Sequence, residues 1–338
     1  MTFKILARSE TSDKSAFDSL FAKAPSLLRT TEEAFGMAPE VWTQALLGRP
    51  LPFPCEFWIA TENDNVIGRI GANLSPFYKD HGYLGFFEAK DKSTAHSLLE
   101  KASSWLRSKG VKAAVGPVNL NTWLPYRFRT DWKDPQVFSW EPNHPRAYSE
   151  YFESFGFQNY ASYHSNGYTG LKDLFESTKA DYEKALQKGF SFRPLIAEQM
   201  LQKDIPSLHR ITMAAFQKNF LFEPVPLDYF KEFYVPLAKK ENLEHAVFAV
   251  SPSGEDVGYF FNVIEKDYFV LKTVGIDPVA RGNGLSNAML HHCLITAVPK
   301  GLEKTISALV KAGNQSESYG KKQKHLWTHE YTLYKKDL

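Results

Sequence analysis

The alternation of apolar and polar positions in the second half of the chain predicts a series of strands and helices. Residues 190–196 are predicted to form a strand, and residues 201–237 form a helical segment with breaks. Apolar runs at 245–250 and 257–263 flank the turn sequence Pro252-Ser253-Gly254, which predicts a hairpin. The remaining predicted elements are a strand at 268–276, a helix from 285 to about 298 and strands at 305–310 and 330–334.

The first half repeats this order of elements. Runs at 57–61 and 66–72 predict a second hairpin, and Ser93 or Thr94 is expected to cap a helix. The other predicted elements of this half are a strand at 83–87, a strand at 111–116, a short helix within 143–157 and a strand at 163–168. An internal repeat of this kind indicates two domains with the same fold.

A glycine-containing loop, Arg281-Gly282-Asn283-Gly284, lies between the strand at 268–276 and the helix that follows. Glycine lets a ligand approach the backbone closely, and the first amides of a helix have no partner inside the helix. Together with the helix dipole, these amides favour an anion such as a pyrophosphate. A dinucleotide fingerprint would need glycine at Asn287, and a P-loop would need Gly-Lys-Ser/Thr, so neither pattern fits.

The loop and the strand before it resemble the acyl-CoA-binding motif of the GNAT acyltransferase superfamily. In that superfamily the loop amides hold the CoA pyrophosphate, and the preceding strand splays from its neighbour to bind the pantetheine arm. The resemblance also implies an oxyanion donor among the strand amides near Val274 or Gly275. The cofactor-binding residues that it implies are Val274, Gly275, Ile276, Arg281, Gly282, Asn283, Gly284, Leu285, Ser286 and Asn314.

The whole chain resembles tandem-GNAT proteins in which one half is degenerate. In the first half the loop Glu88–Ser93 contains no glycine, so a backbone cradle is not expected there. The resemblance implies an α/β fold with two tandem GNAT-like domains, each a mixed, mainly antiparallel central sheet flanked by helices. The expected boundaries are residues 1–170 for the degenerate domain, 171–189 for a linker and 190–338 for the domain with the acyl-CoA-binding loop.

The second half departs from the GNAT pattern after its fifth strand. The usual register places a tyrosine general acid at the position of Lys321, and Tyr319 stands two residues earlier. Tyr319 is therefore the candidate catalytic acid. A carboxylate or a water chain would remove the proton of an attacking amine. Glu223, Glu265 and Asp267 are candidates for this base, and the sequence does not choose among them.

Composition agrees with a cytoplasmic enzyme of 338 residues and two domains. The net charge of +2 gives no field that would attract nucleic acid or membranes, and the apolar run at 1–8 is too short for a signal peptide. Cys55 and Cys293 are too far apart in the sequence to suggest a disulfide framework. His325 and His329 have metal-ligand spacing, but no third ligand converges on them, so no metal site is expected.

Three functions are compatible with these patterns. The first is an acyl-CoA-dependent acyltransferase, most simply an N-acetyltransferase that transfers acetyl from acetyl-CoA to a small-molecule or peptide amine. The second is a catalytically silent CoA-binding tandem-GNAT sensor or scaffold. The third is a Fem-type aminoacyl transferase, which also pairs two GNAT-like halves but would not need the loop Arg281–Gly284.

Overall fold

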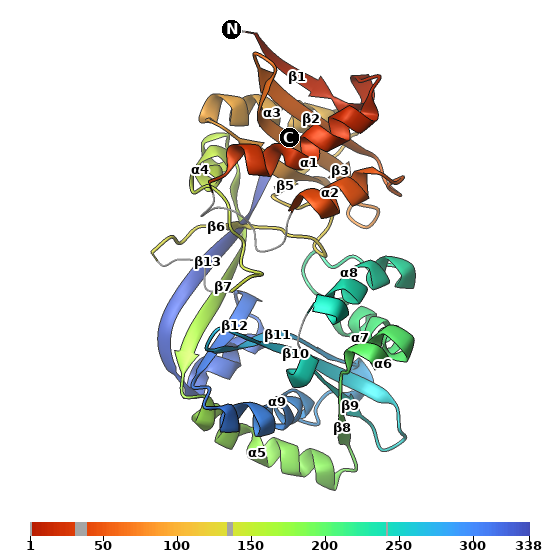
Figure 1. The fold of residues 1–338 in the computed structure, drawn as a ribbon, viewed down its shortest axis with the longest axis vertical. Coiled ribbons are helices and arrows are strands. Elements are labelled where there is room, and N and C mark those ends of the chain that lie inside the picture. Colours follow the sequence, from red (N-terminus) through yellow and green to blue (C-terminus); the bar gives the residue numbers. More distant parts are fainter. Residues whose placement is uncertain (1, 31–38, 134–137, 241–242) are drawn as a thin grey trace. The chain divides into compact units, whose positions relative to one another are not determined.

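The chain folds into two compact units, shown in the computed structural model of Figure 1. The first unit comprises Met1–Tyr163 and His329–Leu338, and the second comprises His164–Thr328. Each unit has a mixed, mainly antiparallel sheet flanked by helices, so the predicted fold class and the internal repeat are confirmed. The structure describes residues 2–30, 39–133, 138–240 and 243–338.

The sheet of the first unit ends on a strand from the C-terminal end of the sequence. Its strands are β1 (Phe3–Ala7), β2 (Cys55–Glu62), β3 (Asn65–Leu74), β4 (His81–Ala89), β5 (Ala113–Gly116), the short β6 (Phe128–Arg129) and β13 (Lys324–Asp337). The order is β1–β2–β3–β4–β5–β13, with β6 beside β13, and only β4 and β5 are parallel neighbours. The helical elements are η1 (Arg8–Glu10), α1 (Lys14–Leu28), α2 (Pro39–Leu47), α3 (Lys92–Ser108) and α4 (Ala147–Ser154).

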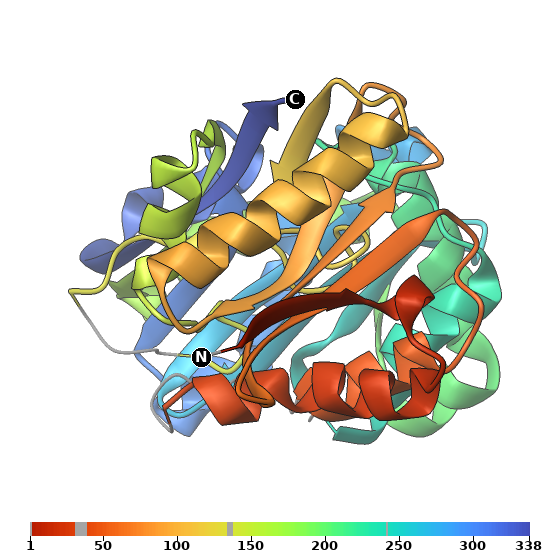
Figure 2. The same cartoon turned by 90° about the horizontal axis from the view of Figure 1, so that it is seen from above.

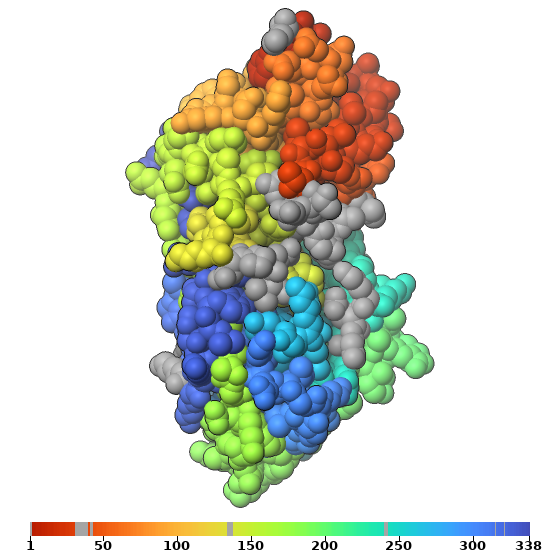
Figure 3. Space-filling view, turned by 60° about the vertical axis from the view of Figure 1, so that its left-hand side comes forward, coloured from red at the N-terminus to blue at the C-terminus, as the bar shows by residue number. Residues whose placement is uncertain are grey.

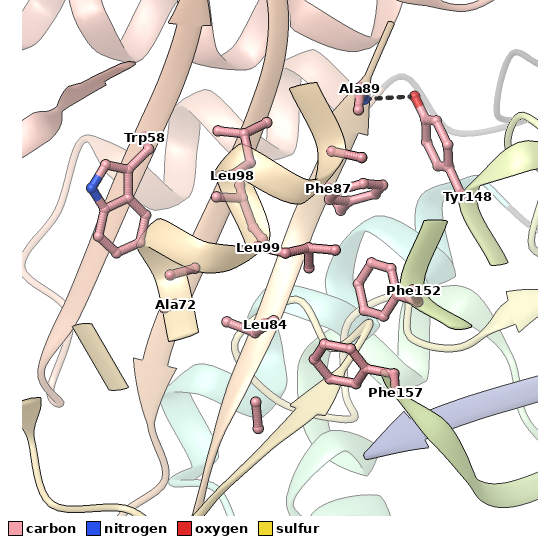
Figure 4. Packing of buried hydrophobic residues seen from close by; sticks show 14 of the residues in the cluster. Trp58, Ala72, Leu84, Phe87, Ala89, Leu98, Leu99, Tyr148, Phe152 and Phe157 are labelled. Atoms are coloured by element: carbon pink, nitrogen blue, oxygen red, sulfur yellow. Dashed lines mark hydrogen bonds between the residues drawn. The ribbon is translucent and has the colours of Figure 1, made fainter. Parts of the chain in front are cut away.

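Helices cover both faces of this sheet because its strands are apolar on both sides (Figure 2). Phe57 and Phe86 pack with α1 and α2, whereas Trp58 and Leu84 pack with α3 and α4. Figure 4 shows the second of these cores, in which the backbone N–H of Ala89 donates to the Tyr148 hydroxyl at 3.2 Å. The predicted hairpin is confirmed, since β2 and β3 pair antiparallel.

The expected cap of α3 is wrong by two to three residues. The helix begins at Lys92, and the side chain of Asp91 accepts from the backbone N–H of Thr94 at 2.8 Å. Asp91 is as good a capping residue as serine, and it precedes the first helical residue directly. Ser93 and Thr94 therefore lie inside the helix.

The second unit repeats the same plan with its own helices. Its strands are the later part of β7 (Gln158–Thr169), β8 (Ser191–Pro194), β9 (Val247–Val250), β10 (Asp256–Glu265), β11 (Tyr268–Ile276) and β12 (Lys304–Lys311). They follow the order β7–β12–β11–β10–β9–β8. The α-helices are α5 (Leu171–Gln187), α6 (Ala197–Gln199), α7 (Ile205–Phe216), α8 (Leu227–Lys240) and α9 (Leu285–Ala297). The short helical turns are η3 (Met200–Asp204), η4 (Leu243–His245), η5 (Pro278–Ala280), η6 (Val298–Lys300) and η7 (Gln315–Lys322).

The segment expected to be a linker, 171–189, forms a helix that belongs to the second unit. Helix α5 packs along α9, and the two helices are neighbours on the surface shown in Figure 3. Leu171, Leu174 and Ala185 of α5 lie in the buried core around α9. The apolar face of α5 explains this, because a helix with one apolar stripe is stabilised by burying it.

The last strand of each half is divided between the two units and ends in the sheet of the other half. Residues Tyr331–Asp337 of β13 pair with β6 and β5 in the first unit, although 330–334 was expected to close the second domain. Conversely, β7 lies beside β12, and the backbone N–H of Leu309 donates to Ser165 Oγ at 2.9 Å. The unit boundaries therefore differ from 1–170 and 190–338, because strand pairing and not sequence proximity decides where these residues pack.

This exchange predicts that a substitution near the C-terminus destabilises the first unit. Leu333 of β13 is fully buried, so Leu333→Ala is expected to cost about 2–5 kcal/mol of unfolding free energy. Hydrogen exchange should then show lost protection in residues 2–30 and 39–133. Leu326→Ala on the same strand is the control, because Leu326 is exposed and its removal should change stability by less than about 0.5 kcal/mol. Loss of protection confined to residues 190–240 would contradict the exchange.

Candidate cofactor and active site

Strands β11 and β12 part midway along their length. Their parallel pairing ends at Leu271 and Ser307, and no later pair follows among the described residues. The antiparallel pairing of β11 with β10 continues to Ile276. Since successive N–H groups of a strand point to opposite edges, one of the Val274 and Gly275 amides faces the gap beside β12. The splay that the resemblance implied for this strand is therefore present after Leu271.

Irregularities in both strands explain why they part. The register between β10 and β11 shifts after the Asn262–Leu271 pair, so Lys272 forms a bulge. A bulge bends its strand and increases the local twist. On the other side of the gap, Leu309 of β12 has a φ of 56°, and its N–H is directed to Ser165 of β7. The two irregularities lie at about the same height along the strands, where β11 keeps its pairing with β10 and β12 bonds to β7.

The glycine loop joins β11 to α9 in a backbone conformation that favours glycine. Gly282 and Gly284 have φ angles of 81° and 69°. Gly284 is the N-cap of α9, and no side chain caps the helix there. A Cβ on Gly282 would meet no atom within 4 Å, so the backbone at this position borders open space. The first amides of a helix at such a position favour an anion, so the loop stays the predicted anion site.

Helix α5 reaches the loop from one side with two charged residues. The Asp181 carboxylate accepts from the Asn287 side-chain amide at 2.6 Å, and its other oxygen lies 2.9 Å from the position that a Cβ on Gly284 would take. Lys188 donates to the Asn283 side-chain oxygen at 2.8 Å. Sequence reasoning missed both contacts because it treated this segment as a linker.

Helix α7 holds the loop from the other side. The Arg281 guanidinium donates to the backbone carbonyl of Ala215 at 2.9 Å, in the last turn of α7. One turn earlier on the same helix, Arg210 forms an ion pair of 2.8 Å with Asp277, which caps η5. The loop is therefore fixed between two helices before any ligand is added.

The candidate acid Tyr319 lies close to the start of α9, in the core of the second unit. It is 9% exposed, its ring centre lies 5.9 Å from that of Phe260, and its hydroxyl lies near the Ser286 side chain. Burial raises the pKa of Tyr319 to about 12. The structure thus brings together two of the predicted residues, Ser286 and Tyr319, and leaves the tyrosine protonated at neutral pH.

A chain of three hydroxyl groups covers the α7 and α8 side of β11. Tyr259 of β10 stands opposite Gly275, and a Cβ on Gly275 would lie 2.6 Å from the tyrosine ring. The Tyr259 and Thr212 oxygens are 2.9 Å apart, and Thr212 donates its own proton to the Leu208 carbonyl at 2.6 Å. Tyr259 therefore donates to Thr212. The hydroxyl of Tyr234 lies near that of Tyr259, and burial raises the pKa of Tyr234 to about 12. Gly275 is needed here because no larger residue fits under this ring.

The three candidate bases occupy different ends of the unit. Glu265 and Asp267 lie at the turn between β10 and β11, about 25 Å along β11 from Gly275 at 3.3 Å per residue. Asp267 also accepts from Lys304 at 2.5 Å, a bond that lowers the pKa of this carboxyl. Glu223 is buried, at 3% exposure, on the connection between α7 and α8. Among the three, only Glu223 comes from the elements that border the cradle.

The remaining predicted residues have structural contacts. The side chains of Val274 and Ile276 pack against the core around α9, and that of Leu285 is buried within it. These residues can therefore offer a ligand their backbone atoms. Asn314 caps η7, where its side-chain oxygen accepts from the Ser316 N–H at 3.0 Å. A role of Asn314 toward a cofactor stays a prediction.

In the first unit the corresponding gap is filled by the chain itself. The parallel pairing of β4 and β5 ends at Tyr83. Beyond it, the N–H of Val118 donates to the Leu84 carbonyl at 2.7 Å, and the Asn119 side chain accepts from the Phe86 N–H at 2.6 Å. A Cβ on Gly85 would lie 2.1 Å from the Val118 carbonyl oxygen, so only glycine permits this contact. The edge of β4 that would face a pantetheine arm is occupied.

The anion position of the first unit is filled in the same way. The Asp91 carboxylate occupies the N-terminus of α3. At the end of β4, buried Glu88 pairs with Arg29 at 2.6 Å and accepts from the Tyr148 hydroxyl at 2.8 Å. Arg69 lies 3.6 Å from the same carboxylate. The Asp91 carboxylate thus takes the position at the helix N-terminus where an anion could bind, and Glu88 beside it is held by Arg29 and Tyr148.

Several chemistries receive no support from the described part of the chain. Within it, no cluster of three metal-ligating side chains occurs. Burial raises the pKa of the Cys293 thiol to about 12, so this cysteine is no nucleophile. No helix there combines the length and the apolar character needed to cross a membrane.

Comparison with solved structures defines the fold. A tandem GNAT protein from the clavulanic acid biosynthesis pathway matches over 99% of this chain and 98% of its own, with a TM-score of 0.54 and 9% identity. A GCN5-related N-acetyltransferase from Kribbella flavida matches over 99% and 72%, with a TM-score of 0.55 and 10% identity. A probable N-acyltransferase from Enterococcus faecalis matches over 100% and 73%, with a TM-score of 0.60 and 7% identity.

The chain therefore has the tandem fold of the GNAT superfamily, as its sequence motifs implied. At these identities the likeness establishes the fold, and activity has to be argued from the site. No protein-family model and no curated protein sequence matches the chain.

The open space at Gly282 provides a test of the cradle. Gly282→Ala introduces a methyl group beside the loop and strains a left-handed residue by about 1–2 kcal/mol. We expect CoA affinity to fall at least about tenfold, a loss of about 1.4 kcal/mol in binding free energy, in calorimetric titrations. Gly284 is a less clean probe, because a side chain there would also collide with Asp181.

Gly301 offers a matched control for this substitution. It has a φ of 79°, and a Cβ there would also meet no atom within 4 Å, but it follows η6 at the other end of α9. Gly301→Ala should therefore lower the melting temperature by a similar amount and leave CoA affinity unchanged. Equal effects of both variants on CoA affinity would show that the loop is only a structural turn.

Proposed function

We propose that the protein is an acyl-CoA-dependent acyltransferase whose second unit binds acyl-CoA, most simply acetyl-CoA, and transfers the acyl group to an amine. The acceptor is a small molecule or a peptide. In this proposal the first unit binds no CoA. The parting of β11 and β12, the loop at Gly282 and Gly284 and the start of α9 would hold the pantetheine arm and the pyrophosphate.

The contrast between the two units carries this proposal. Both contain a strand that parts from its parallel neighbour just before a helix. In the first unit, Val118, Asn119 and Asp91 fill the gap and cap the helix. In the second unit, α9 has no side-chain cap, and Gly282 borders open space. Backbone groups at such a position need a partner, and an acyl-CoA carries amides and phosphates in the right order to supply one.

Acyl transfer needs an oxyanion donor, a base for the amine and an acid for the thiolate, and different residues around β11 would supply them. The acceptor nitrogen attacks the thioester carbonyl carbon, the C–N bond forms, and the C–S bond breaks with the electron pair going to sulfur. A β11 amide at Val274 or Gly275 would stabilise the oxyanion. Glu223 would take the proton that the amine loses, directly or through water. The thiolate takes up a proton from Tyr319 or from solvent.

The position of Tyr319 also favours the second candidate, a CoA-binding sensor or scaffold without turnover. Its hydroxyl already lies near the Ser286 side chain, and its ring is part of the core. A tyrosine with a pKa of about 12 transfers its proton to a thiolate uphill, since the reference pKa of a thiol is about 8.5. Binding and turnover must therefore be measured separately.

Titration of the full chain with acetyl-CoA is expected to give one site per chain. The whole protein has to be used because the last strands of the two units are exchanged. Release of free CoA thiol should then be followed with a panel of amines, amino acids and peptides. Two equivalent CoA sites would contradict the assignment of the first unit as closed. Binding without thiol release for any acceptor would favour the sensor.

Substitution of Tyr319 tests whether its proton is used. Because transfer from this hydroxyl to a thiolate is uphill, Tyr319→Phe is expected to lower kcat less than about tenfold with the best amine of the panel. Loss of a general acid typically costs about 10²–10⁴ in rate. Tyr268→Phe, which removes a hydroxyl at the far end of β11, is the control. A drop of about 100-fold or more confined to Tyr319→Phe would restore the tyrosine as the acid.

A further inference from the structure

The arginine of the cradle is already bound to protein in this structure. Its Nη2 donates to the carbonyl of Ala215 at 2.9 Å. The last carbonyls of a helix lack partners inside the helix and carry the negative end of its dipole, so a cation there stabilises the helix end. Arg281 therefore acts as a C-terminal cap of α7, supplied from a loop 66 residues away in the sequence.

Helix α7 leads directly into the connection to α8. After Phe216 the chain continues as the connection 217–226, which contains the buried Glu223. This connection reaches β12 beyond the point where β11 and β12 part, since the Phe220 ring centre lies 5.2 Å from Lys311 Nζ. It also returns to α7, where the Val225 carbonyl bonds the His209 ring nitrogen at 2.7 Å.

We propose that Arg281 is a positioning residue that couples the filling of the cradle to the order of the connection 217–226. In this proposal its guanidinium bridges the Ala215 carbonyl and a phosphate of the cofactor. The inference rests on the proposed function, because it requires a phosphate at the cradle. The coupling is reciprocal: if a bound phosphate stabilises the end of α7, then an ordered α7 end raises the affinity for the phosphate by the same free energy.

Arginine suits this bridge better than lysine does. A guanidinium has five N–H donors in a fixed planar fork, so one nitrogen can hold a carbonyl while others hold a phosphate. Bonds to phosphate are charge-assisted and stronger than those to a neutral carbonyl. The carbonyl of Ala215 orients the fork before the ligand arrives, so less side-chain freedom is lost on binding.

Hydrogen exchange of the full chain with and without CoA tests the coupling. With saturating CoA we expect protection at two places: at 281–290, where the cradle amides lie, and at 213–226, where exchange should slow about fivefold, at the low end of typical couplings. Arg281→Met should raise exchange at 213–226 without CoA. It should also raise the Kd for CoA about 10- to 100-fold, since one charge-assisted bond is lost. At saturating CoA this variant should regain protection at 281–290 only.

Two further variants test whether the effect of Arg281 comes from its bridging geometry and not from its charge or from a general loss of loop structure. Lys188→Met removes a cation from the same loop on its α5 side, so the CoA-induced protection at 213–226 should persist. Arg281→Lys keeps the charge but not the fork, so CoA should bind without protecting 213–226. If CoA protects 281–290 in the unmodified protein but leaves exchange at 213–226 unchanged or faster, the coupling is wrong and the proposed function still stands. Absence of any CoA binding would overturn the proposed function and the coupling with it.

Discussion

The constraint on which both units depend is the need of an exposed strand edge for hydrogen-bond partners. Where two parallel strands part, the peptide groups facing the gap must bond something else, because leaving them unpaired and buried is costly. In the first unit Val118 and Asn119 supply these bonds from the adjoining segment. In the second unit the pairing of β11 with β12 ends at Leu271, and Leu309 of β12 has a φ of 56°. The same architecture thus has its gap filled by the chain in one unit, whereas in the other we propose that a ligand fills it.

Local sequence signals were sufficient for the elements that make the cradle. The strand Tyr268–Ile276 has the predicted bounds, because its apolar run ends at a proline-containing turn. The helix from Leu285 and the loop before it were predicted from glycines, and their φ angles confirm that glycine is favoured there. The hairpins at 57–72 and 245–263 were equally predictable, since pairing across a short turn follows from two alternating runs.

Contacts between distant segments could not be predicted in this way. Asp181 and Lys188 were hidden in a charged helix that reads as a solvated connection, and only the packing of α5 on α9 brings them to the loop. The bond from Arg281 to Ala215 could not be predicted from the sequence around either residue. The exchange of last strands was missed for the same reason, because an alternating run specifies a strand but not its neighbour. The sequence showed that the loop Glu88–Ser93 has no glycine, but it did not show that Asp91 caps the helix there.

The C-terminal strand also has a consequence for how the molecule is made. A domain at the start of a chain usually folds while the rest is still on the ribosome. Here β5 has β4 on one side and receives its partner on the other side from β13, which also pairs with β6, so the sheet of the first unit stays incomplete until a strand made after the second unit has emerged. Until then β5 presents an unpaired edge of the kind that other chains can join. Completion of the first unit therefore depends on residues that the ribosome adds only after it has made the second unit.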